Sequence, residues 1–177
     1  GEERLGVVGA QLVDAGGRPD PASARRDPLP RRALVSALGL ERFGLEGVHL
    51  PLADDAVIDC DAVSGALMLV RRAAFVAAGG FDEGYFMHAE DLDLCRRVRE
   101  LGFTVRCDGR VRVVHLKGVS SRRRPYRVLL AKHRGTLRYF DKFDAPRVAW
   151  PWRVLIRIGA LLRFGAQLAV GPWRLRR

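Results

Sequence analysis

Runs of apolar residues mark where the chain is expected to form strands. Residues 5–13 (LGVVGAQLV) and 62–70 (AVSGALMLV) are almost continuously apolar, which predicts two buried strands. Gly65 interrupts the second run, and a glycine inside a strand indicates that another group approaches the backbone closely there. Residues 103–106 and 111–115 predict two shorter strands on either side of a turn at the sequence CDGR.

Helical periodicity accounts for much of the remaining sequence. The segment RRAAFVAA over residues 71–78 predicts a short helix, and the two glycines that follow it are a typical left-handed helix end. Residues 90–101 predict a second helix, with apolar positions on one face and Gly102 as its stop. Two further helices are predicted over 126–140 and 152–170, separated by two prolines.

Segments without a sustained period are expected to be mostly loops. The Arg- and Pro-rich residues 19–32 predict a surface loop, and residues 33–42 predict a short helix after it. Residues 45–61, which contain a proline and several aspartates, are expected to be mostly loop, and residues 81–90 form an aromatic, acidic loop.

The last predicted helix is amphipathic. At 100° per residue, one stripe is mostly polar and much of the remaining surface is apolar. The polar stripe consists of Arg153, Arg157, Ala160, Arg163 and Gln167, and the apolar positions include Leu155, Ile158, Leu161, Leu162 and Leu168. The apolar stretch is too short and too interrupted to cross a bilayer, so the helix is expected to lie on a surface. That surface is either an anionic membrane or the rest of the protein.

The chain is strongly basic. Its 177 residues carry a formal net charge of +11, largely from arginines gathered in the second half. Such a surface attracts nucleic acid, anionic lipid head groups or diphosphate-linked substrates, and charge alone does not choose among them. Aromatic residues are not interleaved with the arginines, which argues against nucleic acid as a partner. Three cysteines without a C-x-x-C spacing favour a reducing, cytoplasmic setting over a disulfide framework or a zinc site.

Two places in the sequence carry side chains suited to catalysis. Glu90 and Asp91 fall in the first turn of their predicted helix, where free amide groups favour ionised carboxylates. An ionised carboxylate can accept a proton from a sugar hydroxyl, although acids in a first turn also serve simply as helix caps. His115 ends a predicted strand, where a neutral imidazole could bind a divalent metal or remain a hydrogen-bonded surface group.

One continuous stretch resembles the signature of family 2 glycosyltransferases. It runs VSGALMLVRRAAFVAAGGFDEGYFMHAEDLDLCRRVRELGFTVRCDGRVRVVHLKGVSS. It contains a small-residue strand, a Gly-Gly-Phe-Asp-Glu loop, a Glu-Asp-x-Asp-Leu helix start and a late strand ending in histidine. The opening GVVGAQLVDAGGRPDPASARR is similar to the middle section of these enzymes, especially of bacterial rhamnosyl- and galactofuranosyltransferases. The resemblance extends from about residue 5 to residue 121.

The resemblance implies a fold and a mechanism. The fold is α/β of the GT-A kind, a Rossmann-like mixed sheet flanked by helices, whose nucleotide-binding half and Asp-x-Asp metal motif are expected before Gly1. In this family the Asp of the Glu-Asp pair is the general base of an inverting transfer, which falls on Asp91 with Glu90 beside it. The late-strand histidine, here His115, completes the coordination of a divalent metal, Mg²⁺ or Mn²⁺, on the donor diphosphate.

The same resemblance implies substrate contacts. Asp61 and Gly65 are expected to line the donor-sugar or acceptor pocket. Gly80, Phe81 and Asp82 are expected to lie near the acceptor. Core packing accounts equally well for Gly65. The structural alternative for Gly80 is a helix end, and the alternative for Phe81 is burial in the core. Contacts to a membrane or a diphosphate are expected from Arg122, Arg123, Arg124, Arg153, Arg157 and Arg163.

The sequence predicts two regions and one function. Residues 1–121 are expected to be the carboxy-terminal part of a GT-A catalytic domain, inactive alone, and residues 122–177 a basic amphipathic helical tail. The implied function is transfer of a sugar from dTDP-rhamnose or a UDP-sugar to a polyprenyl-diphosphate-linked or polysaccharide acceptor in cell-envelope glycan synthesis. The expected location is cytoplasmic, peripheral on the inner face of the cell membrane. The alternative is a non-catalytic basic fragment that binds a membrane surface or nucleic acid.

Overall fold

The computed structural model describes residues 2–116 and 124–171, and the chain divides into two compact units. Unit 1 consists of Gly1–Asp82 and Asp91–Lys117 and contains the strands. Unit 2 consists of Glu83–Glu90 and Gly118–Arg177 and contains a loop and the last helices. The loop that precedes Asp91 therefore belongs to the helical unit, whereas Asp91 itself belongs to the sheet unit.

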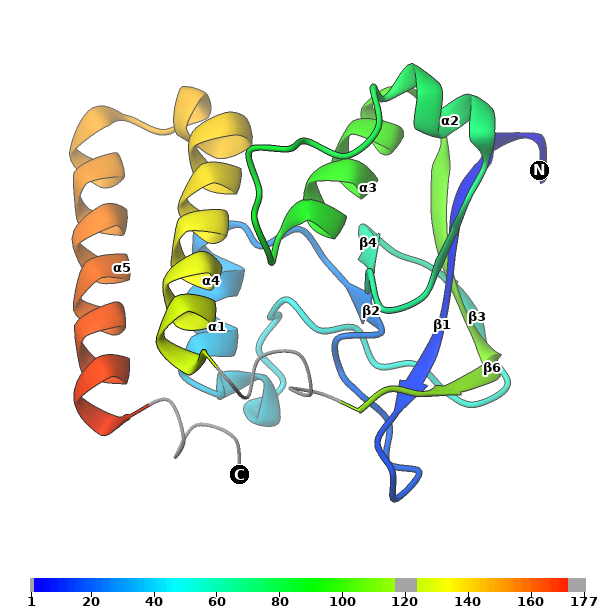
Figure 1. Ribbon diagram of the computed structural model, residues 1–177, viewed down its shortest axis with the longest axis horizontal. Helices are drawn as coiled ribbons and strands as arrows, with labels where there is room; N and C mark the ends of the chain where they lie inside the picture. The colour runs from blue at the N-terminus through cyan, green and yellow to red at the C-terminus, as the bar shows by residue number, and fades with distance from the viewer. Residues whose placement is uncertain (1, 117–123, 172–177) are drawn as a thin grey trace. The chain divides into compact units, whose positions relative to one another are not determined.

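Unit 1 is built on a four-stranded mixed sheet with the strand order β3-β6-β1-β5 (Figure 1). The central strands, β1 (Leu5–Val13) and β6 (Thr104–Val114), run parallel. The edge strands, β3 (Val57–Asp59) and β5 (Met68–Val70), are short and antiparallel to their neighbours. β1 has a partner on each side and is largely buried, which explains its almost continuously apolar sequence and confirms the strand predicted there.

A second, two-stranded sheet packs against the first. Its strands, β2 (Ala24–Arg25) and β4 (Ala62–Val63), pair antiparallel. A Cβ atom at Gly9 in β1 would lie 2.5 Å from Cβ of Val63, so β4 approaches β1 closely enough to require glycine at that position. This close approach brings β2 and its arginine next to the main sheet.

The prediction of a single strand over residues 62–70 is wrong. The segment forms two strands: β4 pairs with β2, β5 pairs with β1, and the amide of Leu67 donates to the carbonyl oxygen of Ser64 in the turn between them. Both pieces are apolar, so apolar character alone could not reveal the change of partner. The predicted surface loop over 19–32 likewise contains β2 and several buried residues.

The two strands predicted around the CDGR sequence form the single strand β6. Ala10 aligns with Asp108 and Gln11 with Arg112, so the residues between are a bulge and the chain does not reverse. Gly109 lies in this bulge. A larger residue would not fit there, because the carbonyl oxygen of Ala53 occupies the space that a side chain would need. The prediction of a turn is therefore wrong, because a turn would have reversed the second half of β6 relative to β1.

The helices of unit 1 largely follow the predicted pattern. α1 (Pro30–Ala37) begins before the predicted start at residue 33, because proline is well tolerated in a first helical turn, and a 3₁₀ turn over Leu40–Phe43 follows it. α2 (Arg72–Ala77) ends at the predicted glycine pair, whose φ angles are 76° and 72°. α3 (Glu90–Glu100) confirms the predicted helix, although Leu101 lies beyond it and is half exposed.

Unit 2 contains two helices, α4 (Pro125–Tyr139) and α5 (Trp150–Val170), which run antiparallel and side by side (Figure 1). A π-helical turn over Phe140–Asp144 and a 3₁₀ turn over Ala145–Arg147 connect them. Both helices agree with the predicted ones. Across residues 2–116 and 124–171, no helix combines the length and the apolar character that a bilayer span requires.

The more buried side of α5 is the side that carries most of the predicted polar stripe. The ring of Phe164 packs edge-on against the ring of His133 in α4, with the ring centroids 5.0 Å apart. The partly buried side chains of α5 fall on this same side of the helix: Arg153, Ile156, Ala160, Phe164 and Gln167. The predicted apolar positions stay between 38% and 69% exposed. α5 therefore leaves its apolar surface open to solvent.

Candidate active site

Asp91 lies in the first turn of α3, and both of its carboxylate oxygens accept hydrogen bonds. Oδ2 accepts from the amide of Gly65 at 2.9 Å and from Nη2 of Arg25 at 2.6 Å. Oδ1 accepts from the amide of Leu92 at 2.8 Å. The side chain is 13% exposed. The predicted base is thus held in one orientation with limited access to solvent.

Gly65 lies in the turn between β4 and β5, and Asp91 is the group that approaches it. A Cβ atom at Gly65 would lie 3.3 Å from Cβ of Asp91, closer than most real contacts of a Cβ atom. The prediction that a group comes close to the backbone at this glycine is therefore confirmed. Gly65 orients the carboxylate through its amide, and a direct contact of Gly65 with a sugar stays a prediction.

Arg25 is the residue of this site that the sequence did not reveal. It lies in β2, within a segment expected to be a surface loop, yet its side chain is only 14% exposed. Its Nη2 donates to Asp91 and, at 2.8 Å, to the carbonyl oxygen of Val63. The opening stretch that resembles family 2 enzymes ends in Ala-Arg-Arg and so offered a signal. Nothing in the sequence, however, links Arg25 to a carboxylate 66 positions later.

The surroundings of Asp91 decide its charge. Burial raises the pKa of Asp91, because a buried carboxylate loses hydration. The positive charge of Arg25 and the hydrogen bonds from Gly65, Arg25 and Leu92 act in the opposite direction and outweigh burial. The pKa of Asp91 therefore lies below its ordinary value, and the carboxylate is ionised at neutral pH, as a general base must be.

The loop before Asp91 has a strained backbone. His88 and Ala89 both have positive φ angles, 67° and 70°, a conformation that residues with a Cβ atom disfavour. Within unit 2, the carbonyl of His88 comes so close to Gly135 in α4 that a side chain at Gly135 would collide with it. Contact with α4 thus supports the strained loop from which α3 starts. Glu90 is partly buried at this start, and its role beside the base stays a prediction.

Asp61 takes part in a network of ion pairs inside unit 1. Its Oδ2 accepts from the amide of Asp27 at 2.8 Å and lies 3.7 Å from Nη1 of Arg32. Its Oδ1 lies 3.3 Å from Nη1 of Arg99. Asp27 is buried and accepts from Arg99 and Arg96, each at 2.6 Å. These contacts give Asp61 a structural role, while its contact with a sugar or an acceptor stays a prediction.

Gly80 belongs to the end of α2, where Arg97 of α3 binds the free carbonyl groups. Nη1 of Arg97 donates to the carbonyl oxygen of Gly80 at 2.8 Å and to that of Ala78. Arg97 is itself paired at 2.6 Å with Asp93, which is fully buried. This arrangement satisfies the last carbonyls of α2 and confirms that the glycine pair ends the helix. A contact of Gly80 with the acceptor stays a prediction.

Phe81 and Asp82 follow directly after this helix end. The ring of Phe81 packs edge-on against Phe75, with the centroids 5.7 Å apart, yet Phe81 remains 46% exposed. The interpretation of Phe81 as a core residue is therefore wrong. Asp82 is partly buried. Contacts of these two residues with the acceptor stay predictions.

His115 follows the last residue of β6, as predicted, and its amide donates to the carbonyl oxygen of Val13 at 2.9 Å. It therefore lies at the carboxyl ends of two parallel strands, where α/β proteins bind ligands. Its Nδ1 is buried without a hydrogen-bond partner in the described part of the chain, which suits a metal ligand. Over residues 2–116 and 124–171, no group of three or more His, Cys, Asp or Glu side chains could hold an ion.

The arginines expected to contact a membrane or a diphosphate have different surroundings. Arg122 and Arg123 lie outside the described residues, and Arg124 is exposed just before α4. Arg153 donates to a backbone carbonyl of the segment that precedes α5, and Arg157 pairs at 2.8 Å with an aspartate of the π-helical turn. Arg157 and Arg163 are exposed. Their contacts with anions stay predictions.

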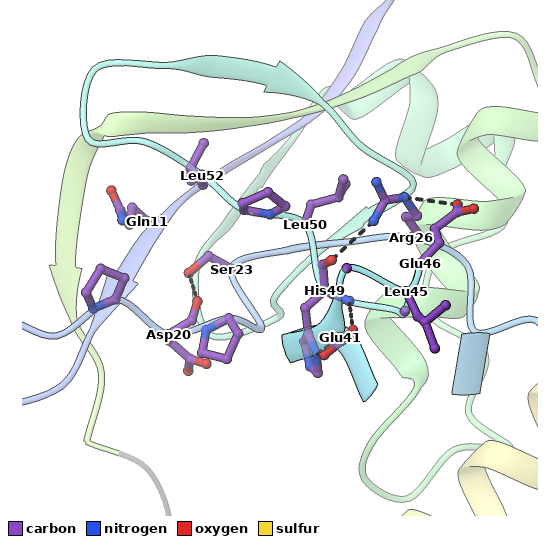
Figure 2. Close-up of a pocket in the computed structure, with 15 residues that line it drawn as sticks. Gln11, Asp20, Ser23, Arg26, Glu41, Leu45, Glu46, His49, Leu50 and Leu52 are labelled. Carbon is purple, nitrogen blue, oxygen red and sulfur yellow. Dashed lines mark hydrogen bonds and ion pairs between the residues drawn. The ribbon is translucent and has the colours of Figure 1, made fainter. Parts of the chain in front are cut away.

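Unit 1 also contains a pocket of about 640 Å³, and Asp91 does not line it. Figure 2 shows polar side chains of this pocket turned toward one another. Nδ1 of His49 lies 2.8 Å from Oε2 of Glu41, and Arg26 donates to the carbonyl oxygen of His49 at 3.2 Å. Proline and leucine side chains complete much of the lining. Because these polar side chains bind one another, Asp91 and its surroundings remain the candidate active site.

The chain is similar to curated rhamnosyltransferases. No protein-family model matches the chain. The chain is 39% identical over 165 residues to the N-acetylglucosaminyl-diphospho-decaprenol L-rhamnosyltransferase of Mycobacterium tuberculosis, with 87% of this chain and 50% of that protein covered. It is 39% identical over 83 residues to the rhamnosyltransferase WbbL of Escherichia coli, with 45% of this chain and 29% of that protein covered. The chain thus spans half the length, or less, of these curated relatives.

The mixed sheet flanked by helices is consistent with a partial GT-A-like fold, which confirms the predicted fold class. The matches at 39% identity support a rhamnosyltransferase-like protein of glycosyltransferase family 2, the family that the sequence resembles.

Proposed function

We propose that the full-length protein transfers a sugar from a nucleotide sugar to a lipid-linked or polysaccharide acceptor in cell-envelope glycan synthesis. The observation that most supports the proposal is the largely buried Asp91 carboxylate, held by Arg25 and the amide of Gly65 at the start of α3. The names of both relatives add rhamnose as the transferred sugar, and the name of the mycobacterial protein adds a diphospho-decaprenol acceptor. We therefore propose dTDP-rhamnose as the donor, with a UDP-sugar as the alternative.

In the proposed reaction, Asp91 removes the proton of the acceptor hydroxyl. The acceptor oxygen forms a bond to the anomeric carbon while the bond between that carbon and the donor diphosphate breaks. The electron pair of the broken bond leaves on the diphosphate oxygen. Because attack comes from the face opposite the leaving group, the anomeric centre is inverted.

We also propose that His115 is one ligand of a divalent metal, Mg²⁺ or Mn²⁺. Its buried Nδ1 without a partner in the described residues supports this role. A bound ion would stabilise the negative charge that develops on the departing diphosphate. The other ligands are expected from the Asp-x-Asp motif that the family resemblance places upstream.

The metal proposal is tested by the binding of the nucleotide sugar at increasing Mn²⁺, measured by calorimetry on the full-length protein. His115→Ala should bind the donor more weakly and respond less to the metal. His49→Ala is the matched control, since His49 pairs with Glu41 in the separate pocket. A metal response of His115→Ala equal to that of the unaltered protein removes His115 from the ligand set. Equal weakening in both variants also contradicts a specific ligand role.

The transfer reaction is tested with labelled dTDP-rhamnose and labelled UDP-sugars. Each donor is offered together with a polyprenyl-diphosphate-linked N-acetylglucosamine or a polysaccharide acceptor. We expect the label to move from dTDP-rhamnose to the lipid-linked acceptor, with an inverted anomeric configuration by NMR. Absence of transfer from every donor to both acceptors rejects the proposed function. A retained configuration rejects the single-displacement mechanism.

The exposed apolar surface of α5 supports a membrane as a partner, and we propose that α5 lies in the interface of an anionic membrane. Trp150 and Trp152, at the start of the helix, are 74% and 63% exposed, and tryptophan favours the level of the lipid head groups. Arg157 and Arg163 border the apolar surface, where anionic head groups would meet them. This placement would hold the protein peripherally at the inner face of the cell membrane, next to a lipid-linked acceptor.

A further inference from the structure

The two oxygens of the Asp91 carboxylate are not equivalent. Oδ2 accepts from the side chain of Arg25 and from the amide of Gly65. Among the described residues, Oδ1 accepts only from the amide of Leu92, which is the next residue of the chain. A carboxylate oxygen can accept two hydrogen bonds. Oδ2 is therefore fully occupied, and Oδ1 keeps a site for one further donor.

Arg25 is held in place independently of Asp91. Its backbone is fixed by the pairing of β2 with β4, where its carbonyl oxygen also accepts from the amide of Asp61 at 2.9 Å. Its Nη2 is anchored to the carbonyl oxygen of Val63 in the same small sheet. With 14% of the side chain exposed, Arg25 is not a mobile surface group. The small sheet therefore presents a positive charge at a fixed point beside α3.

Two titratable side chains, from two elements, lie close to Asp91. Arg25 lies on β2, and Cys95 lies one turn further along α3. Burial raises the pKa of Cys95 to about 11, so this thiol is neutral where the protein functions. The turn between β4 and β5 contributes an uncharged amide at Gly65. Among the described residues, Arg25 is thus the charge that counteracts the burial of Asp91.

We propose that Arg25 is a positioning residue that holds Asp91 ionised through Oδ2, so that Oδ1 is the oxygen that takes the proton of the acceptor hydroxyl. This inference rests on the proposed function. Paired with a guanidinium group, Asp91 is a weak base. It removes the proton as the bond between the acceptor oxygen and the anomeric carbon forms, because bond formation makes that hydroxyl more acidic. The proton ends on Oδ1 of Asp91, and the electron pair of the broken bond ends on the diphosphate.

The experiment compares the full-length protein with its Arg25→Met, Arg25→Lys and Arg26→Met variants across pH. Loss of the Arg25 charge should raise the pKa of Asp91, so the acidic limb of the kcat profile should move to higher pH in Arg25→Met. The maximal kcat should fall by roughly 10-fold to 100-fold, while the KM for the donor changes much less. Arg25→Lys keeps a positive charge and should restore much of the acidic limb. Arg26→Met is the matched control, because Arg26 interacts with Glu46 and His49 and does not contact Asp91.

A second measurement does not depend on turnover. The carboxyl carbon of Asp91, assigned in the ¹³C spectrum by its loss in Asp91→Asn, should titrate at higher pH in Arg25→Met than in the unaltered protein or in Arg26→Met. The proposed role of Arg25 is overturned if Arg25→Met shifts neither the acidic limb of the kcat profile nor the titration of the Asp91 carboxyl carbon. This holds even when Asp91→Asn is inactive. An active Asp91→Asn variant instead overturns the assignment of the base. A loss of thermal stability in Arg25→Met with unshifted titration means that Arg25 is structural only.

Discussion

The two units differ in how far water reaches some of their arginines. In unit 1, three arginines are largely shielded and paired with shielded carboxylates: Arg25 binds Asp91, while both Arg96 and Arg99 bind Asp27. In unit 2, Arg157 and Arg163 are exposed along the apolar surface of α5. The net charge of +11 therefore does not describe one uniform basic face.

The physical reason for the difference is the surrounding dielectric. A shielded ion pair holds its two side chains in a fixed geometry, because separating them would leave an unpaired charge in a poorly hydrated site, which costs free energy. An exposed arginine acts on whatever anion approaches, and salt screens its effect. Variants of the paired arginines and aspartates in unit 1 should therefore alter catalysis and folding with little response to salt. Variants of α5 should alter lipid binding with a strong response to salt.

The largest effect should come from Asp91→Asn. The amide keeps the shape of the carboxylate but cannot take a proton, so the transfer rate of the full-length protein should fall by roughly 10²-fold to 10⁴-fold. Donor binding, measured by calorimetry, should remain nearly unchanged. Near-normal turnover of this variant would remove Asp91 from the role of base.

The next effect concerns folding of unit 1. Asp27→Ala removes the shared carboxylate between Arg96 and Arg99, and the free energy of unfolding should fall by about 3 kcal/mol, since two guanidinium groups lose their partner in a shielded site. Denaturant titration of the full-length protein measures this change. Glu46→Ala is the control, because Glu46 also pairs with several arginines but is more exposed, and its effect should be far smaller. An equal loss in the free energy of unfolding for Asp27→Ala and Glu46→Ala would contradict the distinction between shielded and exposed ion pairs.

A smaller effect is expected when α5 loses its apolar surface. Ile158→Asp combined with Leu162→Asp should weaken binding of the full-length protein to acidic vesicles by at least about tenfold, because apolar contact with the lipid is lost. Co-sedimentation at low and high salt measures the binding, and high salt should also release the unaltered protein.

The control for this test alters exposed apolar residues of unit 1. Leu69→Asp combined with Val76→Asp adds the same charge at sites that are 72% and 67% exposed. It should leave vesicle binding close to that of the unaltered protein, apart from the small effect of the charge itself. Equal binding of both double variants contradicts the membrane proposal. A change from dimer to monomer in the α5 variant, seen by light scattering without lipid, would assign the surface to a second copy.

The smallest effect is a pH dependence of the contact between α4 and α5. Burial lowers the pKa of His133; a hydrogen bond with Leu129 opposes this, and the charges of Arg163 and Lys132 add to it. The unfolded chain therefore binds a proton at a pH where the folded chain does not. The free energy of unfolding should fall as pH drops below about 6.5 and level off below the folded-state pKa. Between about pH 6.5 and the folded-state pKa, the melting temperature of His133→Phe should change less with pH than that of the unaltered protein. An equal change in both proteins contradicts the prediction.

The sequence by itself determined the local elements and the place of the carboxylate proposed as the base. β1 follows from its continuous apolar run, and the end of α2 follows from two glycines with left-handed backbone angles. α3 follows from its helical period, which also places Glu90 and Asp91 in the first turn. These features depend on residues within a turn or two of one another, so a single segment contains the information that forms them.

Only the tertiary structure decided what those elements meet. Arg25 reaches Asp91 across 66 positions, and two adjacent apolar pieces, β4 and β5, pair with different strands. The packed side of α5 combines polar and apolar residues, while the predicted apolar positions stay exposed, which its period alone could not predict. In each case the outcome depends on which distant segment supplies the neighbouring surface. A periodic pattern describes the chemistry of a face, but not the partner that will cover it.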